Sequence, residues 1–203
     1  DNGLLYLNPE TTTLKEVVVN GRKKATTILN KFTRTGFSSF AYGKTVIKSP
    51  EAAQPFYCIQ KNSTLKELII YKTHGAARFR VKIYDYDSLT MMPTIPLTDS
   101  IIEVSSSNKK VKLNLENYAI TIPNNIFYVA IQWLQIPENE YYEYTLKKIN
   151  GRKQYDTGFK PGIFTKKEDE NSKNLALYKA ANEKWEYNSF LNNSLRISAI
   201  IEY

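Results

Sequence analysis

The sequence has very little cysteine and histidine, with one of each among 203 residues. One cysteine cannot form an internal disulfide, so a small disulfide-held scaffold is excluded. A zinc cluster of cysteine and histidine ligands is excluded for the same reason. Glycine and proline contribute eight residues each, which rules out a collagen-like or low-complexity chain. No apolar run approaches the roughly 18 residues of a membrane-spanning helix. We therefore expect a folded domain with its own core and no membrane span.

The motifs of common enzyme classes are also missing. The chain has no Gly-x-Ser-x-Gly element and no glycine-rich loop suited to a phosphate. His74, the single histidine, precedes Gly75 in a turn-like sequence, and Cys58 lies in an apolar run that predicts burial. We therefore expect no nucleophile–histidine pair and no enzyme. A carboxylate-based glycosidase is the one enzymatic alternative.

The positive charge is spread along the chain. The net charge is +8, and residues 1–50 hold eight basic and three acidic side chains, so the rest of the chain is nearly balanced. Short clusters such as Arg22–Lys24 differ from the single basic face of a nucleic-acid-binding domain, and we expect no nucleic-acid partner. The acidic run Glu168–Glu170 follows two lysines in a polar stretch, which predicts a solvated loop.

Alternating apolar and polar residues predict a fold made mainly of β-strands. In residues 78–84, Phe79, Val81 and Ile83 share one face and basic residues the other. Residues 127–134 and 195–203 show the same period of two, and the second stretch runs to the last residue. In residues 65–71, strict alternation would place Leu65 on one face with Ile69 and Tyr71, opposite Leu68 and Ile70.

Shorter strands are expected at 40–47, 100–104, 110–115, 141–146 and 162–165. Helical periodicity is weak, with a short helix expected over 25–32 and a helical turn over 174–181. About ten strands without crossover helices favour antiparallel pairing. Uneven strands and long connections at 88–99 and 147–161 favour a sandwich over an up-and-down barrel. We predict an all-β, antiparallel, jelly-roll-like β-sandwich over residues 35–203, with little helix and with residues 1–34 as an N-terminal extension or linker.

Residues 14–23, Leu-Lys-Glu-Val-Val-Val-Asn-Gly-Arg-Lys, resemble the linker that follows a carboxypeptidase-regulatory-like domain in cell-envelope proteins of the Bacteroidetes. In transporters of that group the stretch precedes a TonB-dependent plug. Here Lys15 stands where the family has an acidic residue, most of the regulatory-like domain is missing, and the remaining chain is too short for a plug and transporter. The resemblance therefore implies a location, which is periplasmic, outer-membrane-associated or extracellular, rather than transport.

The same segment suggests a partner. Leu14, Val17, Val18 and Val19 form an extended, β-branched stretch that is suited to pairing with the sheet edge of another envelope protein. The alternatives are an edge strand of this domain or a plain linker. The body also resembles β-sandwich modules of secreted proteins from the same bacteria, through residues 79–87, 111–115 and 127–133. That resemblance implies a fold more than an activity.

Three aromatic residues are candidates for ligand binding. Carbohydrate-binding modules stack flat rings on sugars, and alternation places Tyr142 and Tyr144 on one face of their strand. Trp185 is flanked by charged residues, which suits either an exposed platform or an inward anchor. The alternative is that these rings are half-buried strand residues, as is common in β-sheets.

Asp85 and Asp87 project to the same side at the end of an expected strand. Such a pair suits calcium bound together with loop carbonyls, or one half of a glycosidase acid–base pair. The alternative is a solvated strand end that caps a turn. No other cofactor is expected.

These patterns favour a non-catalytic cell-envelope or secreted module that mediates assembly or partner binding. A carbohydrate-binding module that uses surface tyrosine and tryptophan, with calcium as its candidate ion, is the alternative. An envelope protein and a glycan are therefore the two expected kinds of partner.

Overall fold

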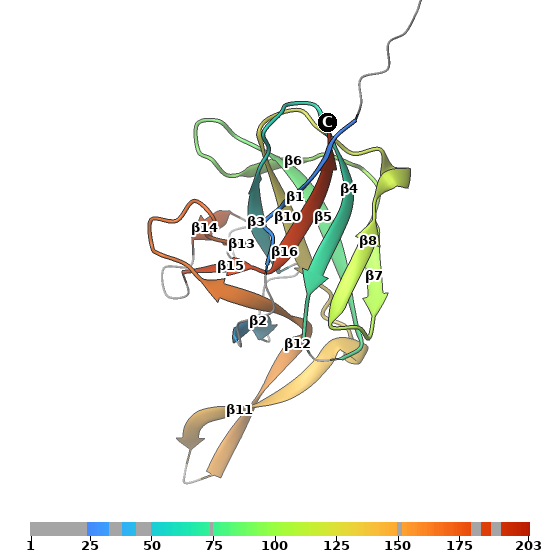
Figure 1. The fold of residues 1–203 in the computed structure, drawn as a ribbon. Coiled ribbons are helices and arrows are strands. Elements are labelled where there is room, and N and C mark those ends of the chain that lie inside the picture. The colour runs from blue at the N-terminus through green and yellow to red at the C-terminus, as the bar shows by residue number, and fades with distance from the viewer. Residues whose placement is uncertain are drawn as a thin grey trace, which may run out of the picture.

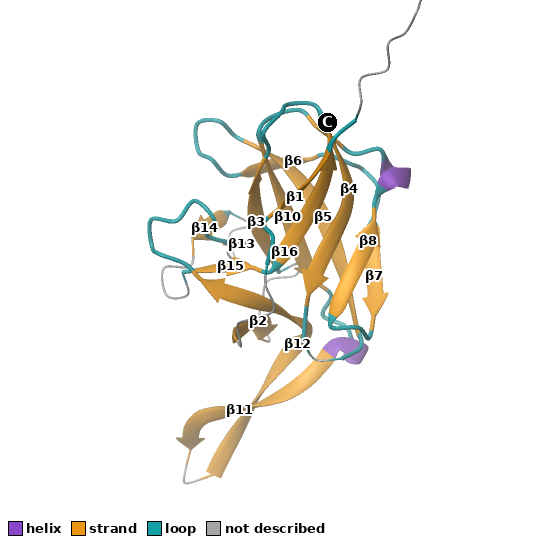
Figure 2. Ribbon diagram, in the orientation of Figure 1, coloured by secondary structure: helices purple, strands orange, loops and turns teal. Residues whose placement is uncertain are grey.

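Strands make up almost all of the regular structure. The computed structural model describes residues 24–32, 38–43, 50–73, 75–149, 152–179, 184–187 and 192–203, and for 143–149 and 152–156 it describes the backbone. The described helices are two three-residue 3-10 turns, Glu116–Tyr118 and Pro137–Asn139 (Figure 2), and neither is long enough to cross a membrane. The prediction of an all-β fold with little helix is confirmed.

Two antiparallel sheets pack face to face and form a jelly-roll-like sandwich (Figure 1). The first sheet runs in the order β1 (Thr26–Leu29), β16 (Ile197–Glu202), β4 (Ser63–Tyr71) and β8 (Lys110–Asn114), with β9 (Thr121–Ile122) also beside β4. The second runs in the order β14 (Trp185–Tyr187), β13 (Leu177–Lys179), β3 (Glu51–Tyr57), β10 (Ile126–Trp133), β5 (Ala77–Tyr86) and β6 (Pro93–Pro96), with β7 (Ile102–Ser106) also beside β5.

A third, smaller sheet contains β11 (Glu140–Ile149), β12 (Arg152–Lys167) and β15 (Asn193–Leu195), with β2 (Ser38–Gly43) also beside β12. The hairpin of β11 and the first part of β12 extends away from the sandwich (Figure 1). The second half of β12 returns to the body and pairs with β15. This sheet therefore brings residues near 166 beside residues near 194, which matters for the site described below.

The core lies between the two larger sheets. The predicted inward face of β5, with Phe79, Val81 and Ile83, is fully buried, and the basic residues between them are partly or fully exposed. Phe56 and Phe127 stack within this core with ring centroids 5.0 Å apart. Burying each such side chain contributes about 1.5–3 kcal/mol to folding, so this alternation is a main source of stability.

A β-bulge in β4 changes the expected alternation. Ile200 pairs with Glu67 and Ile201 pairs with Leu65, so Lys66 is an extra residue in the ladder. An extra residue reverses the order of faces beyond it. Leu65, Leu68 and Ile70 are therefore all fully buried, and the expectation that Leu65 faces away from Leu68 and Ile70 is wrong.

Three other local expectations are corrected. Residues 26–29 form strand β1 rather than a helix, because β-branched Thr26, Thr27 and Ile28 pair with β16. Part of residues 1–34, the expected extension, thus contributes a strand to the first sheet. Residues 177–179 form β13 rather than a helical turn, because they pair with β3 and β14. The stretch 147–161 is mostly β11 and β12 rather than a long connection.

Candidate functional site

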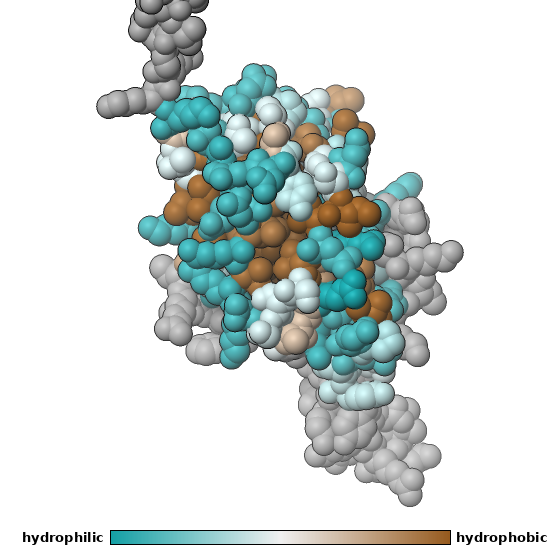
Figure 3. Space-filling view, turned by 90° about the vertical axis from the view of Figure 1, so that its right-hand side faces the viewer, coloured by the Kyte–Doolittle hydropathy of each residue, from teal (hydrophilic) through white to brown (hydrophobic). Residues whose placement is uncertain are grey.

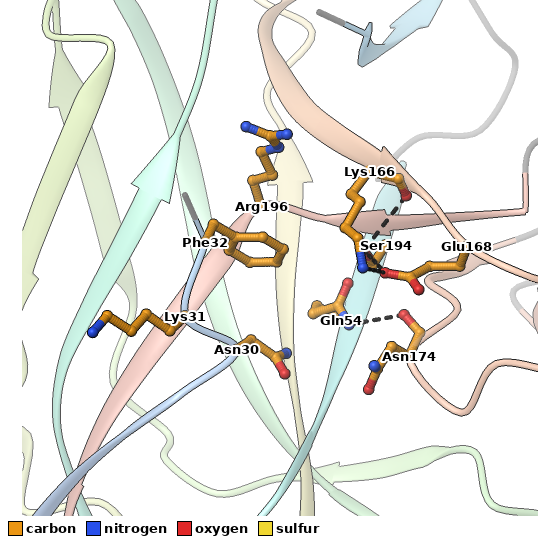
Figure 4. A pocket seen from close by; sticks show the side chains of 9 residues that line it. All are labelled: Asn30, Lys31, Phe32, Gln54, Lys166, Glu168, Asn174, Ser194 and Arg196. Atoms are coloured by element: carbon orange, nitrogen blue, oxygen red, sulfur yellow. Dashed lines mark hydrogen bonds and ion pairs between the residues drawn. The ribbon is translucent and has the colours of Figure 1, made fainter. Parts of the chain in front are cut away.

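A polar cleft of about 390 Å³ opens where several strands of the three sheets meet. One wall follows β1, the opposite wall follows β12, and the base comes from β3 and from the junction of β15 and β16. Figure 4 shows the lining side chains, which are mostly polar or charged: Asn30, Lys31, Phe32, Gln54, Lys166, Glu168, Asn174, Ser194 and Arg196.

Gln54 forms the base of the cleft and is fully buried. Its Oε1 accepts a hydrogen bond from the Leu195 backbone N–H at 2.6 Å, and its Nε2 donates to the Asn174 carbonyl at 3.0 Å. The side chain therefore joins β3 to β15 and to the loop around residue 174. Because both ends of the amide are used inside the protein, this residue positions the site rather than offering a group to a ligand.

The wall after β12 carries a connected set of charged and hydroxyl groups. The Lys166 ammonium lies 3.1 Å from Glu168 Oε1, and the Ser194 hydroxyl donates to the same oxygen at 2.8 Å. The Glu168 side chain is only 11% exposed, whereas the Lys166 side chain is 55% exposed. The carboxylate is thus held in one orientation, and the ammonium retains N–H donors that face solvent.

The opposite wall is fixed by the turn after β1. Asn30 has a φ of 49°, a conformation that asparagine tolerates better than most residues. Its Nδ2 donates to the Pro55 carbonyl at 3.2 Å, and its own carbonyl accepts from the Ser198 hydroxyl at 2.7 Å. This anchored turn presents the half-buried ring of Phe32, which extends into the cleft toward Gln54 and Ser194 (Figure 4).

Positive charge exceeds negative charge around the cleft. Arg196 is 6% exposed, and its guanidinium lies 6.0 Å from the centre of the Phe32 ring, within the range of a cation–π contact. With Lys31 and Lys166 the lining has three cationic side chains, and Glu168 is the one carboxylate among the described lining residues. In Figure 4 the Lys31 and Arg196 side chains both point away from Gln54, whereas the Lys166 side chain lies beside Glu168 and Ser194.

None of these nine residues was a sequence-predicted site residue. The run Glu168–Glu170 was expected to be a solvated loop; Asp169 and Glu170 are exposed, but Glu168 folds back against Ser194. The lining comes from five separated parts of the chain, and no spacing in the sequence links them. The one local signal is the pair of oppositely charged residues at 166 and 168 directly after a strand, and such pairs are common on solvated surfaces.

The two predicted aromatic residues whose side chains the structure describes, Trp185 and Tyr142, lie in different sheets. Trp185 lies in the seven-stranded sheet, half-buried, with its ring edge-to-face on Tyr84 at 5.7 Å and the Lys179 ammonium 5.7 Å from its centre. This packing fits the inward-anchor alternative. Tyr142 is 72% exposed on β11, in the small third sheet, and the side chain of Tyr144 lies outside the described part.

Asp85 and Asp87 each serve local structure. Asp85 accepts hydrogen bonds from the Asn124 side-chain amide at 3.1 and 3.2 Å, and Asp87 accepts from the Leu89 backbone N–H at 2.8 Å. The Leu89 bond lowers the pKa of the Asp87 carboxyl. Within the described ranges, no group of three or more His, Cys, Asp or Glu residues is placed to hold a metal ion. The arrangement fits the turn-capping alternative.

The remaining predicted residues divide into two groups. Leu14, Val17, Val18 and Val19 lie outside the described residues, as does His74. Cys58 is buried in the main core, and burial raises its thiol pKa to about 11. A thiol with that pKa is protonated at neutral pH, and the expectation of a buried, structural cysteine agrees with this position.

Comparison with known proteins shows a likeness of fold. No protein-family model matches the chain, and no curated protein sequence does. A structure of the clostridial cysteine protease Cwp84, a cysteine-to-alanine variant after propeptide cleavage, aligns with a TM-score of 0.51 and 14% identity. The alignment covers 88% of this chain and 40% of that chain, so the present chain spans well under half of that protein.

A second structure contains the cysteine protease and lectin-like domains of Cwp84, a surface layer associated protein of Clostridium difficile. It aligns with a TM-score of 0.46 and 13% identity, over 76% of this chain and 32% of that one. Because the first match is only 14% identical in sequence, its likeness to this chain concerns the fold, and no residue roles are transferred from it.

Proposed function

We propose that this protein is a non-catalytic binding module and that the polar cleft takes a saccharide. The observation that carries the proposal is an aromatic ring, Phe32, set across from a fixed array of charged, amide and hydroxyl groups. Sugar hydroxyls both donate and accept hydrogen bonds, so they suit a lining that mixes a carboxylate, cations and amides. The cleft volume of about 390 Å³ lies in the usual range for small-ligand sites.

The arrangement supports binding rather than hydrolysis. A glycosidase needs two carboxyl groups, about 5–10 Å apart, on either side of the scissile bond. Among the described lining residues only Glu168 supplies a carboxylate, and it is engaged by Lys166 and Ser194. The excess of cationic groups favours saccharides that carry a carboxylate or a sulfate over neutral ones.

Calorimetric titration with defined neutral and acidic oligosaccharides tests the proposal. Phe32→Ala and Lys166→Ala are each expected to weaken binding about tenfold or more, equivalent to about 1.4 kcal/mol. Lys167→Ala is the matched control, because its side chain is exposed on the same strand and does not line the cleft. Saturable binding that survives both cleft variants but is lost in Tyr142→Ala would move the site to the predicted aromatic surface and would refute the cleft.

Partner binding through strand addition is the second candidate, and the edges of the sandwich favour it. Among the described strands, β8 pairs only with β4 and β7 only with β5, so each leaves one edge open. A hollow of about 310 Å³ lies between these edges, and Figure 3 shows apolar residues at the centre of this face, ringed by hydrophilic ones. Open edges accept an extended strand from another chain.

The occupant we propose for this edge is the segment of residues 14–19 from a second copy, whose sequence favours an extended conformation. This hypothesis rests on the apolar, β-branched character of that segment. Sedimentation of the full chain is expected to show concentration-dependent association that Val18→Pro abolishes, since proline removes a backbone donor. A chain that remains monomeric at high concentration contradicts it. A secreted or envelope location is proposed on the resemblance of residues 14–23 alone.

A further inference from the structure

A row of polar residues crosses the outer face of the seven-stranded sheet. The strand register places Glu51 of β3 opposite Gln132 of β10, Gln132 opposite Arg80 of β5, and Arg80 opposite Glu103 of β7. Side chains opposite one another on neighbouring strands lie about 5 Å apart, so the four form a continuous line. The main core occupies the other face of this sheet, so the row does not serve to fill it.

Glu51 is fully buried and fixes the orientation of the Gln132 amide. Its Oε1 accepts from Lys82 Nζ at 2.7 Å and from Gln132 Nε2 at 3.1 Å, and its Oε2 accepts from the Tyr84 hydroxyl at 2.8 Å. An ionised carboxylate can only accept hydrogen bonds, so Gln132 must turn its NH₂ group toward Glu51. The carbonyl oxygen of Gln132 therefore points away from Glu51.

That carbonyl oxygen has no hydrogen-bond partner within the described structure. Gln132 is 5% exposed and lines a groove of about 340 Å³ between β5 and the loop from β6 to β7. Buried polar atoms in folded proteins almost always have a partner. Gln132 Oε1 is thus a buried acceptor at the base of this groove, held in place by a buried carboxylate and available to a hydrogen-bond donor.

The rest of the groove supplies donors and an apolar rim. Lys82 uses one N–H for Glu51, and Arg80 donates through Nε to Glu103 at 3.3 Å, so both retain further donors for a ligand. Ile101 is 71% exposed at the rim. Lys82 and Arg80 are already paired with Glu51 and Glu103, and Asp99 on the facing loop adds a further carboxylate. The groove therefore has no excess of positive charge, which favours a neutral ligand group over an anion.

We propose that this groove binds a peptide segment through one main-chain amide, whose N–H donates to Gln132 Oε1 and whose carbonyl accepts from Lys82 or Arg80. An amide is the common neutral group that offers a donor and an acceptor side by side. The exposed rim favours a peptide over an acetamido sugar, because a peptide also brings an apolar side chain to Ile101. The groove shares no lining residue with the polar cleft, so this proposal does not depend on saccharide binding.

The test is a titration of the isotope-labelled full chain with acetyl-glycyl-leucyl-glycinamide, followed by NMR. We expect saturable shifts in the Gln132 side-chain NH₂ signals and in the backbone amides of β5. Gln132→Met is expected to weaken binding at least tenfold, and Arg80→Ala several-fold. Arg78→Ala is the matched control: Arg78 lies on the same face of β5 and also pairs with Glu103, but it does not line the groove.

Several outcomes would overturn the proposal. The first is the absence of saturable shifts in the wild-type chain. The second is equal affinity for a peptide whose amides are all N-methylated, because that peptide has no N–H to donate. Binding of N-acetylglucosamine in place of the peptide would refute the peptide assignment. Should Gln132→Met fail to fold, Arg80→Ala and the N-methylated peptide still decide the question.

Discussion

Replacing Gln54 with methionine separates the hydrogen bonds of this residue from its packing. The methionine side chain has a similar length and no branching, but it satisfies neither the Leu195 N–H nor the Asn174 carbonyl, which Gln54 meets at 2.6 and 3.0 Å. Each buried backbone group left without a partner costs about 1–3 kcal/mol. We therefore expect the variant to lose roughly 2–6 kcal/mol in free energy of unfolding.

Urea denaturation followed by tryptophan fluorescence measures this change. At this chain length, each kcal/mol shifts the melting temperature by about 2–4 °C, so calorimetry gives an independent value. Gln60→Met is the control, because Gln60 is exposed in the turn between β3 and β4 and its replacement should change stability by less than about 0.5 kcal/mol. If Gln54→Met is as stable as this control, the two hydrogen bonds do not hold the base of the cleft.

Three further outcomes follow from buried or partnered groups. Glu51→Gln removes a fully buried charge that pairs with Lys82 at 2.7 Å; because the Lys82 side chain is 33% exposed and can be solvated without this partner, denaturation should show a loss of about 1–3 kcal/mol. Cys58 should react with iodoacetamide at pH 8 only after unfolding, since burial raises its pKa to about 11, and mass spectrometry checks this. Because the pKa of Asp87 is lowered in the folded protein, its contribution to stability is present above the ordinary value of 3.8 and disappears as pH falls through the lower folded value. Asp87→Asn should therefore flatten the dependence of melting temperature on pH over that acid range.

The strands that the sequence predicted well are those with two different faces. β5 is buried on one side and partly exposed on the other, so its alternation matches its environment. β3 was missed because its first six residues, including Glu51, Gln54 and Pro55, are all buried, and its sequence is neither alternating nor continuously apolar. β12 was recognised only over residues 162–165, because the register shift between Phe159 and Ile163 interrupts any period of two.

The polar cleft could not be predicted because tertiary pairing alone creates it. Pairing of β12 with β15 brings Lys166 beside Ser194, and pairing of β1 with β16 places the turn at Asn30 against Ser198. These contacts join residues more than 25 positions apart in the chain. Composition and local spacing do not reveal such long-range contacts. The predicted site residues were therefore aromatic and acidic residues that form local patterns in the sequence.

Strand β3 shows how the two proposed sites are related. Parallel and central strands that are buried on both faces are usually runs of apolar residues. In β3, however, Gln54 points to one face and Glu51 to the other, and both are completely buried. Each side chain forms hydrogen bonds with residues outside β3. Gln54 bonds to Leu195 and Asn174 at the polar cleft. Glu51 bonds to Lys82 and Gln132 at the groove.

A buried polar group destabilises a fold unless its partners are in place, so each of these residues fixes the positions of the groups that it binds. Glu51 and Gln54 are therefore positioning residues. Replacing Gln54 should disturb saccharide binding and leave the peptide groove intact, and replacing Glu51 should do the reverse. A folded variant of either residue that weakens saccharide binding and peptide binding equally would contradict these separate positioning roles.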